Sequence, residues 1–147
     1  MADTRIQLEV EDWVRSVWMT KKYGQEFYRE RVKLTSGGVF DFDAADKSKR
    51  FVATISTSGA RTASGKYAVG KMLKIRSDMY FLLLAEADRR LVVLTEKDMY
   101  DQCLKEQSGG RVPATIEFAL AEIPSDMRLR LDSARKIASK EVRPITT

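Results

Sequence analysis

The most constraining feature of the sequence is a pair of alternating segments joined by a short charged turn. In residues 39–44, two phenylalanines alternate with Asp41 and Asp43. This alternation places apolar side chains on one face of a strand and polar side chains on the other. Residues 50–57 repeat the pattern after the turn. The two segments therefore predict neighbouring strands of a sheet that has a partly polar face.

Apolar residues at helical spacing surround this pair of strands. Residues 6–22 and 64–77 each predict an amphipathic helix, and a first strand is expected at residues 31–34. Residues 79–85 are almost wholly apolar, which predicts a central strand covered on both faces. We expect this strand to lie parallel to the strand at residues 50–57, with the second helix as the crossover.

The C-terminal third of the sequence predicts further strands and helices. Residues 91–94 predict a strand, and Thr95 begins a helix that ends at a pair of glycines. Another strand is expected at residues 114–121, followed by a last helix at residues 126–139.

Length and composition narrow the class of protein. The chain has 147 residues, which is typical of one domain, and we expect a single α/β domain with a core at about residues 6–95 and a C-terminal extension at about residues 96–140. It has no histidine, which excludes Ser-His-Asp catalysis and histidine-bound metals. Its lone cysteine, Cys103, cannot form an internal disulfide.

The charge balance and the absence of long apolar runs indicate location and partners. No apolar run is long enough to span a bilayer or to form a secretory leader, so we expect a cytoplasmic protein without a membrane partner. The chain contains 26 Lys and Arg against 21 Asp and Glu, a net charge of +5. This excess favours nucleic acid as a partner, while a protein partner or a homo-oligomer also fits.

The predicted order of elements and one turn motif resemble a known superfamily. Ser36-Gly37-Gly38 leads into an apolar–Asp–apolar strand, within the order α-β-β-β-α-β. This combination resembles the restriction-endonuclease-like fold of the PD-(D/E)xK nucleases, over roughly residues 8–94. The resemblance implies a mixed sheet flanked by helices, to which this chain adds a C-terminal strand and helices.

The same resemblance indicates where a metal site would lie and how this sequence departs from it. Such nucleases hold a divalent ion with an acid on the second strand and an acid-x-lysine pair on the third. Asp41 matches the first acid, Asp43 is expected to share its face, and Thr54 and Ser56 stand for the acid and the lysine on that same face. Two hydroxyl groups supply neither the anionic ligands nor the positive charge that phosphodiester cleavage requires. We therefore expect a nuclease-like domain without cofactor that binds nucleic acid or a protein.

An active enzyme is the alternative, namely a Mg²⁺- or Mn²⁺-dependent DNA or RNA endonuclease or exonuclease. Asp41 and Asp43 would then be the metal ligands. The groups that could complete such a site are Glu9 or Glu11 from the first helix and a migrated lysine from the second, Lys66, Lys71 or Lys74. The basic residues expected to bind nucleic acid are Arg61, Lys66, Lys71 and Lys74. Alternating acids on a strand and spaced lysines on a helix are also typical of ordinary solvated surfaces.

Overall fold

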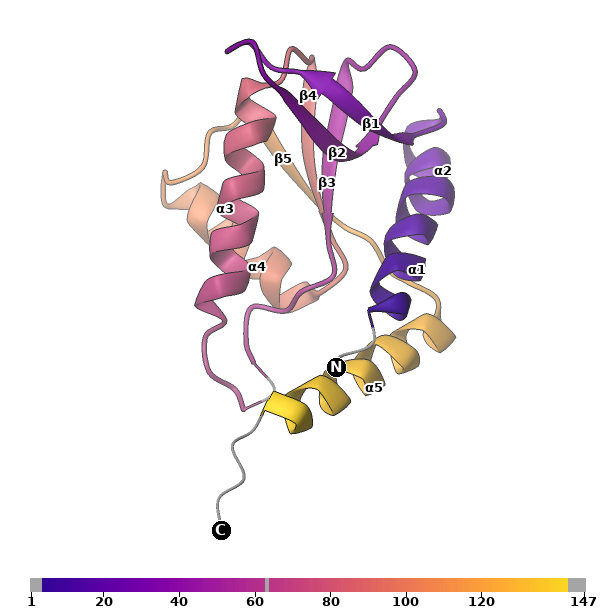
Figure 1. Cartoon of the computed structure of the whole chain (residues 1–147). Helices are drawn as coiled ribbons and strands as arrows, with labels where there is room; N and C mark the ends of the chain where they lie inside the picture. The colour runs from indigo at the N-terminus through magenta and orange to yellow at the C-terminus, as the bar shows by residue number, and fades with distance from the viewer. Residues whose placement is uncertain (1–3, 63, 143–147) are drawn as a thin grey trace.

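Alternating strands and amphipathic helices build a five-stranded sheet with helices on both faces (Figure 1). The computed structural model describes residues 4–62 and 64–142, with side chains up to residue 137. The elements in chain order are α1 (Arg5–Trp13), a π-helical segment η1 (Val14–Trp18), α2 (Met19–Tyr23), β1 (Tyr28–Lys33), β2 (Val39–Ala45), β3 (Phe51–Ser56), α3 (Val69–Leu84), β4 (Arg89–Leu94), α4 (Lys97–Ser108), β5 (Ile116–Leu120) and α5 (Ser125–Val142). None of the described helices combines the length and the apolarity that crossing a membrane requires.

The sheet is mixed and its strands follow chain order, β1-β2-β3-β4-β5. β1, β2 and β3 pair antiparallel, whereas β3 pairs parallel with β4 and β4 parallel with β5. Parallel neighbours need a crossover between them, and α3 provides it between β3 and β4. The expected α/β class, with a mixed sheet flanked by helices, is therefore confirmed.

The strand expected at residues 79–85 is wrong, because these residues belong to α3 and to the turn that follows it. A continuous apolar run does not distinguish a covered strand from a helix that is buried on more than one side. Met79 and Leu82 of this segment are buried in the core, and Phe81 stacks on Phe40 of β2 with 4.3 Å between ring centroids. The parallel partner of β3 is β4. The sequence predicted a strand at this position, but not that it would be the strand reached by the crossover.

Each face of the sheet has its own core. Val52 and Val92 pack toward α3 and α4, whereas their neighbours Ala53 and Leu91 pack toward α1, η1 and α5. Figure 1 shows these two helical layers on opposite sides of the strands. Cys103 is buried in the first core, where burial raises the pKa of its thiol to about 11, so it is an inert core residue.

Candidate functional site at the fork of β2 and β3

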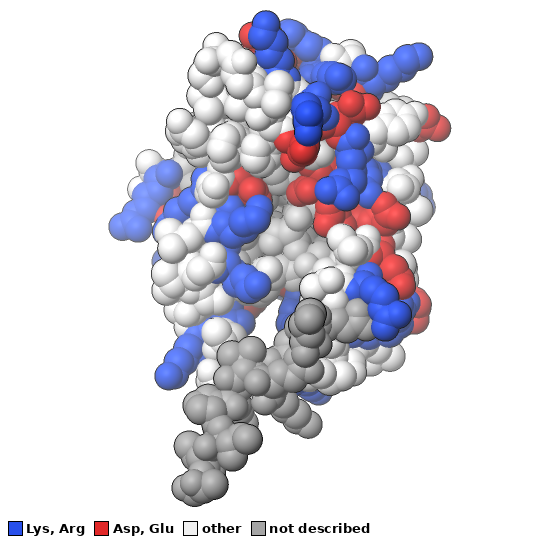
Figure 2. Space-filling view, in the orientation of Figure 1, with Lys and Arg blue, Asp and Glu red and all other residues white. Residues whose placement is uncertain are grey.

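β2 and β3 pair over a short stretch and then diverge. The ladder between them joins Ala44 with Ala53 and Ala45 with Val52. Among the strands of the described residues, none pairs with the C-terminal half of β3 on this side. In the view of Figure 1 it lies between α3 and α1, and the surface there is hollowed (Figure 2). Acidic side chains gather above this hollow, and basic side chains lie on both sides of it.

A register irregularity in β2 shapes the fork. Against β1, Phe42 pairs with Glu30 and Ala45 pairs with Tyr28, so β2 has one more residue than β1 between these pairs. Such a bulge breaks the alternation of side chains along a strand. Phe42 and Ala45 accordingly pack toward α3, while Ala44 packs toward α1.

Asp43 lies within the bulge and bridges the two diverging strands. Its Oδ2 accepts a hydrogen bond of 2.8 Å from the backbone N–H of Ile55 in β3. Its backbone carbonyl accepts a second bond, 3.0 Å long, from Nη1 of Arg15 in η1. The half-buried aspartate is therefore held between β3 and the N-terminal helix.

Glu11 of α1 approaches Asp43 from the helix side, and the two carboxyl groups share a hydrogen bond. Burial, together with the charge and the hydrogen bond of Asp43, raises the pKa of Glu11 from 4.5 to about 7. Arg15 limits the rise, with Nη1 3.8 Å from Oε1 of Glu11. Glu11 therefore keeps its proton up to about neutral pH.

The wall formed by α3 contributes an acid and a lysine. Nζ of Lys74 donates a 2.8 Å hydrogen bond to Oδ1 of Asp78, one helical turn away. Burial raises the pKa of Asp78, Lys74 opposes the rise, and the nearby charge of Asp43 adds to it. Lys71 is exposed and precedes Lys74 on the same stripe of the helix. The fork thus brings together side chains from α1, β2 and α3.

Asp41 does not join this group. It lies on the face of β2 opposite Phe42, is exposed, and accepts a 3.0 Å hydrogen bond from Nε of Arg31. That bond lowers the pKa of Asp41. Asp41 and Asp43 therefore have different surroundings, because Asp41 pairs with Arg31 whereas Asp43, at the bulge, contacts β3.

Thr54 and Ser56 are also not on the face of Asp41. They alternate with Ile55 and so follow Val52 toward the α3 side of the sheet. Thr54 is only 3% exposed, and Oγ of Ser56 accepts a bond from the backbone N–H of Ser58. Neither residue brings a charge to the fork. Within residues 4–62 and 64–142, no group of three or more acidic or sulfur side chains is arranged to hold a metal ion.

The basic loop before α3 lies against a different part of the surface. Nη1 of Arg61 donates to the carbonyl of Gly65 at 3.0 Å, and Arg61 pairs with Tyr67 across a small turn. Arg61 and Tyr67 also line a second hollow, which faces α4. Lys66 is exposed in the same turn. Of the expected nucleic-acid-binding residues, only Lys71 and Lys74 belong to α3 itself.

A second buried glutamate lies where β3 and β4 end. Both carboxylate oxygens of Glu96 accept hydrogen bonds of 2.8 Å from Nη1 of Arg128 in α5, and Arg135 of the same helix donates to Oε1. The two guanidinium groups also donate to the backbone carbonyls of Thr95 and Thr57. Burial alone would raise the pKa of Glu96, but these partners outweigh it and lower the pKa. This cluster attaches α5 to the sheet.

Several members of the fork were not identified from the sequence as site residues. Asp78 fell outside the expected helix, although its spacing of four from Lys74 was the signal that could have identified it. Arg15 gave no signal, because only the π-helical segment turns it inward to 7% exposure. Glu9 and Glu11 were both expected as candidates for the site. The structure places Glu11 at the fork, whereas Glu9 pairs with Arg130 of α5.

Comparison with known proteins adds no family assignment. No protein-family model matches the chain, and neither curated proteins nor solved structures gave a match. The geometry of the fork and the charges around it are therefore the evidence on function.

Proposed function

We propose that this chain is a restriction-endonuclease-like domain that binds nucleic acid across the fork of β2 and β3 without cleaving it. The observation that carries the proposal is the position of Asp43, a half-buried acid at the point where the second and third strands separate. The helix, three-strand meander, crossover helix and parallel strand around it follow the order that the superfamily resemblance implies.

Charge around the fork favours a polyanion over a neutral partner. Lys71 and Lys74 are exposed on α3, and Arg29 extends from β1. Figure 2 shows basic side chains on both sides of the hollow. The phosphate backbone supplies most of the affinity when basic side chains line a groove, and that affinity falls steeply with salt. Nucleic acid fits this arrangement better than an acidic protein because its phosphates repeat along the length of the hollow.

The composition of β3 favours binding without cleavage. Phosphodiester hydrolysis with a metal ion needs anionic ligands to hold the ion and a positioned positive group to stabilise the transition state. Thr54 and Ser56 supply neither. The loss of a single positioned stabilising donor typically costs roughly 3 kcal/mol in the barrier, so the missing lysine alone would slow cleavage by two orders of magnitude or more.

One observation favours the second candidate, a Mg²⁺- or Mn²⁺-dependent phosphodiesterase. Glu11 and Asp43 form a carboxyl pair, and Lys74 stands on the facing helix where a migrated lysine would be needed. Protein sites often hold Mg²⁺ through one or two carboxylates plus the phosphates of the substrate. In such an enzyme the ion would take the place of the proton that Glu11 holds.

Binding is tested first. We expect short DNA and RNA probes to bind wild-type protein at low ionic strength, with affinity falling as salt rises. The double variant Lys71→Ala, Lys74→Ala should weaken binding at least about tenfold. The matched control Lys97→Ala, Lys105→Ala removes two exposed lysines from α4 and should bind like wild type. Equal binding by the two double variants would contradict the assignment of the binding surface.

Cleavage then separates the two candidates. Plasmid, linear duplex and single-stranded substrates are incubated with Mg²⁺ or Mn²⁺ and wild-type protein, Asp43→Asn or Asp41→Asn. The proposal expects no cleavage with any of the three proteins. Cleavage that is lost in Asp43→Asn and kept in Asp41→Asn would contradict binding without cleavage and would establish the phosphodiesterase. Asp41→Asn is the matched control, because both aspartates belong to β2 but only Asp43 lies at the fork.

A further inference from the structure

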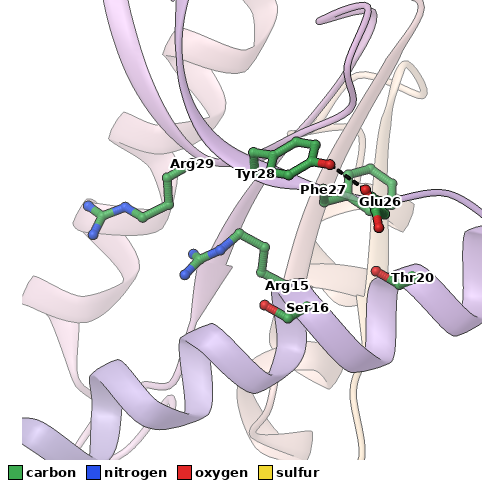
Figure 3. A pocket seen from close by; sticks show the side chains of 7 residues that line it. All are labelled: Arg15, Ser16, Thr20, Glu26, Phe27, Tyr28 and Arg29. Carbon is green, nitrogen blue, oxygen red and sulfur yellow. Dashed lines mark hydrogen bonds between the residues drawn. The ribbon is translucent and has the colours of Figure 1, made fainter.

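A cavity of about 640 Å³ opens beside the fork, between the N-terminal helix and β1. Its volume falls within the range of small-molecule sites. The cavity is larger than a lone ion requires, and it can hold a phosphate together with its nucleoside. The helical wall contributes Arg15, Ser16 and Thr20, and β1 with the residues before it contributes Tyr28 and Arg29 (Figure 3).

The two arginines come from opposite walls and extend in the same direction, as Figure 3 shows. Arg15 is held in place by Glu11, Asp12 and the carbonyl of Asp43. Arg29 is exposed and makes no ion pair with any described residue, although the charges of Glu11 and Asp41 lie within its range. A guanidinium without a fixed partner beside a second, fixed guanidinium is suited to take a phosphate oxygen.

The helical wall adds neutral donors on the same stripe. Ser16 and Thr20 are four residues apart, so both hydroxyl groups face the cavity from one side of the helix. Neither hydroxyl is engaged by a side chain of the described residues 4–62 and 64–137. Hydroxyl groups are common hydrogen-bond partners of nucleic-acid phosphates. Two hydroxyl groups together with two arginines could therefore donate hydrogen bonds to the oxygens of one phosphate.

Tyr28 supplies a stacking surface at the other end of the cavity. Tyr28 is 44% exposed. Its hydroxyl donates a hydrogen bond to the carboxylate of Glu26, so the hydroxyl end of the ring points away from the two arginines (Figure 3). Exposed aromatic rings bind single-stranded bases by stacking, and alanine substitution of such a ring weakens binding. A base can use this ring only when it is not stacked inside a duplex.

In a step that rests on the nucleic-acid binding proposed above, we infer that this cavity binds one nucleotide of a single strand. Its phosphate lies between Arg29 and the hydroxyls of Ser16 and Thr20, and its base stacks on Tyr28. The protein then distinguishes single strands, flaps and frayed ends from continuous duplex through a site separate from the lysines of α3.

The test measures affinity by fluorescence anisotropy with a single-stranded oligonucleotide and with a duplex of the same length. We expect wild type to prefer the single strand. Tyr28→Ala should weaken single-strand binding at least about fivefold and duplex binding much less, whereas Tyr28→Phe keeps the ring and should retain the preference. Arg29→Ala should weaken single-strand binding and reduce its salt slope by about 0.7, the value of one phosphate contact.

The matched control is Arg111→Ala, an exposed arginine beyond α4 that makes the same change in net charge. Thermal melts check that each variant is folded. If Tyr28→Ala and Arg29→Ala bind both probes like wild type while Lys71→Ala, Lys74→Ala loses binding, the nucleotide site is refuted and the proposed function stands. If wild type binds neither probe at low salt, the proposed function fails and the nucleotide site fails with it.

Discussion

Glu11 and Glu96 are both largely buried glutamates next to β3, and their surroundings shift their pKa values in opposite directions. Glu11 faces another carboxyl group, and its pKa rises to about 7. Glu96 faces two guanidinium groups, and its pKa falls. A structural carboxylate is surrounded by partners that favour its charge, whereas an acid that is costly to ionise indicates a site for an external ligand or proton. The comparison supports placing function at the fork and not at the Glu96 cluster.

Removing the charge of Glu96 should have the largest effect on stability. Glu96→Gln removes the anion that both guanidinium groups bind most closely and leaves them only Asp132, at 3.6 and 3.8 Å. Because each arginine side chain is 33% exposed, we expect a loss of about 2–3 kcal/mol, below the 3–5 kcal/mol typical of a fully buried pair. Urea unfolding measures it. Glu117→Gln breaks a surface pair with Arg89 and should cost less than about 1 kcal/mol; equal losses would contradict the structural role of Glu96.

The contribution of Glu11 to stability should change with pH in the direction opposite to that of Glu96. Because its folded pKa lies above its ordinary value of 4.5, the folded state holds the proton more tightly than the unfolded chain. Its contribution is therefore full below about pH 4.5 and is lost as pH rises toward 7. The partly open site is screened, so we expect the loss to be roughly 2 kcal/mol or less.

Glu11→Gln isolates this contribution, because the amide cannot ionise. Urea unfolding at pH 5 and pH 8 should show a smaller fall in stability for the variant than for wild type. Glu96 changes in the other direction, since its lowered pKa contributes stability that is lost as the pH falls. An identical pH dependence for wild type and Glu11→Gln would show that the pKa of Glu11 is not raised in the folded protein.

The sequence could predict the sheet but not the fork. The alternation around Asp41 and the helical spacing at residues 6–22 are local or periodic signals, and the structure retains both. The parallel crossover was expected to reach residues 79–85, but it reaches β4 instead. The bulge at Asp43 depends on the pairing of β2 with both neighbouring strands, which no single segment encodes. The strand predicted at residues 79–85 was wrong for a related reason, because a helix that tertiary packing buries on several sides is also almost wholly apolar.

The contribution of Asp43 to the pKa of Glu11 can be measured directly. Asp43→Asn keeps an oxygen that can accept the N–H of Ile55 but removes the charge. We expect the pKa of Glu11 to fall and yet to stay above 4.5, because burial is the largest cause of its rise and is unchanged. Carboxyl-carbon NMR titration measures this shift. A fall to the ordinary value would instead assign the whole effect to the neighbouring charge.

The smallest effect is expected at Asp41, only two residues from Asp43 along β2. Asp41 and Arg31 are 65% and 69% exposed, so solvent screens their ion pair and it contributes little to stability. Asp41→Asn should therefore leave the urea unfolding midpoint close to that of wild type and leave the pKa of Glu11 unchanged. Urea unfolding and the same NMR titration check both values. A shifted Glu11 pKa in Asp41→Asn would mean that the two aspartates share one electrostatic environment, and the bulge would then not separate them as the structure places them.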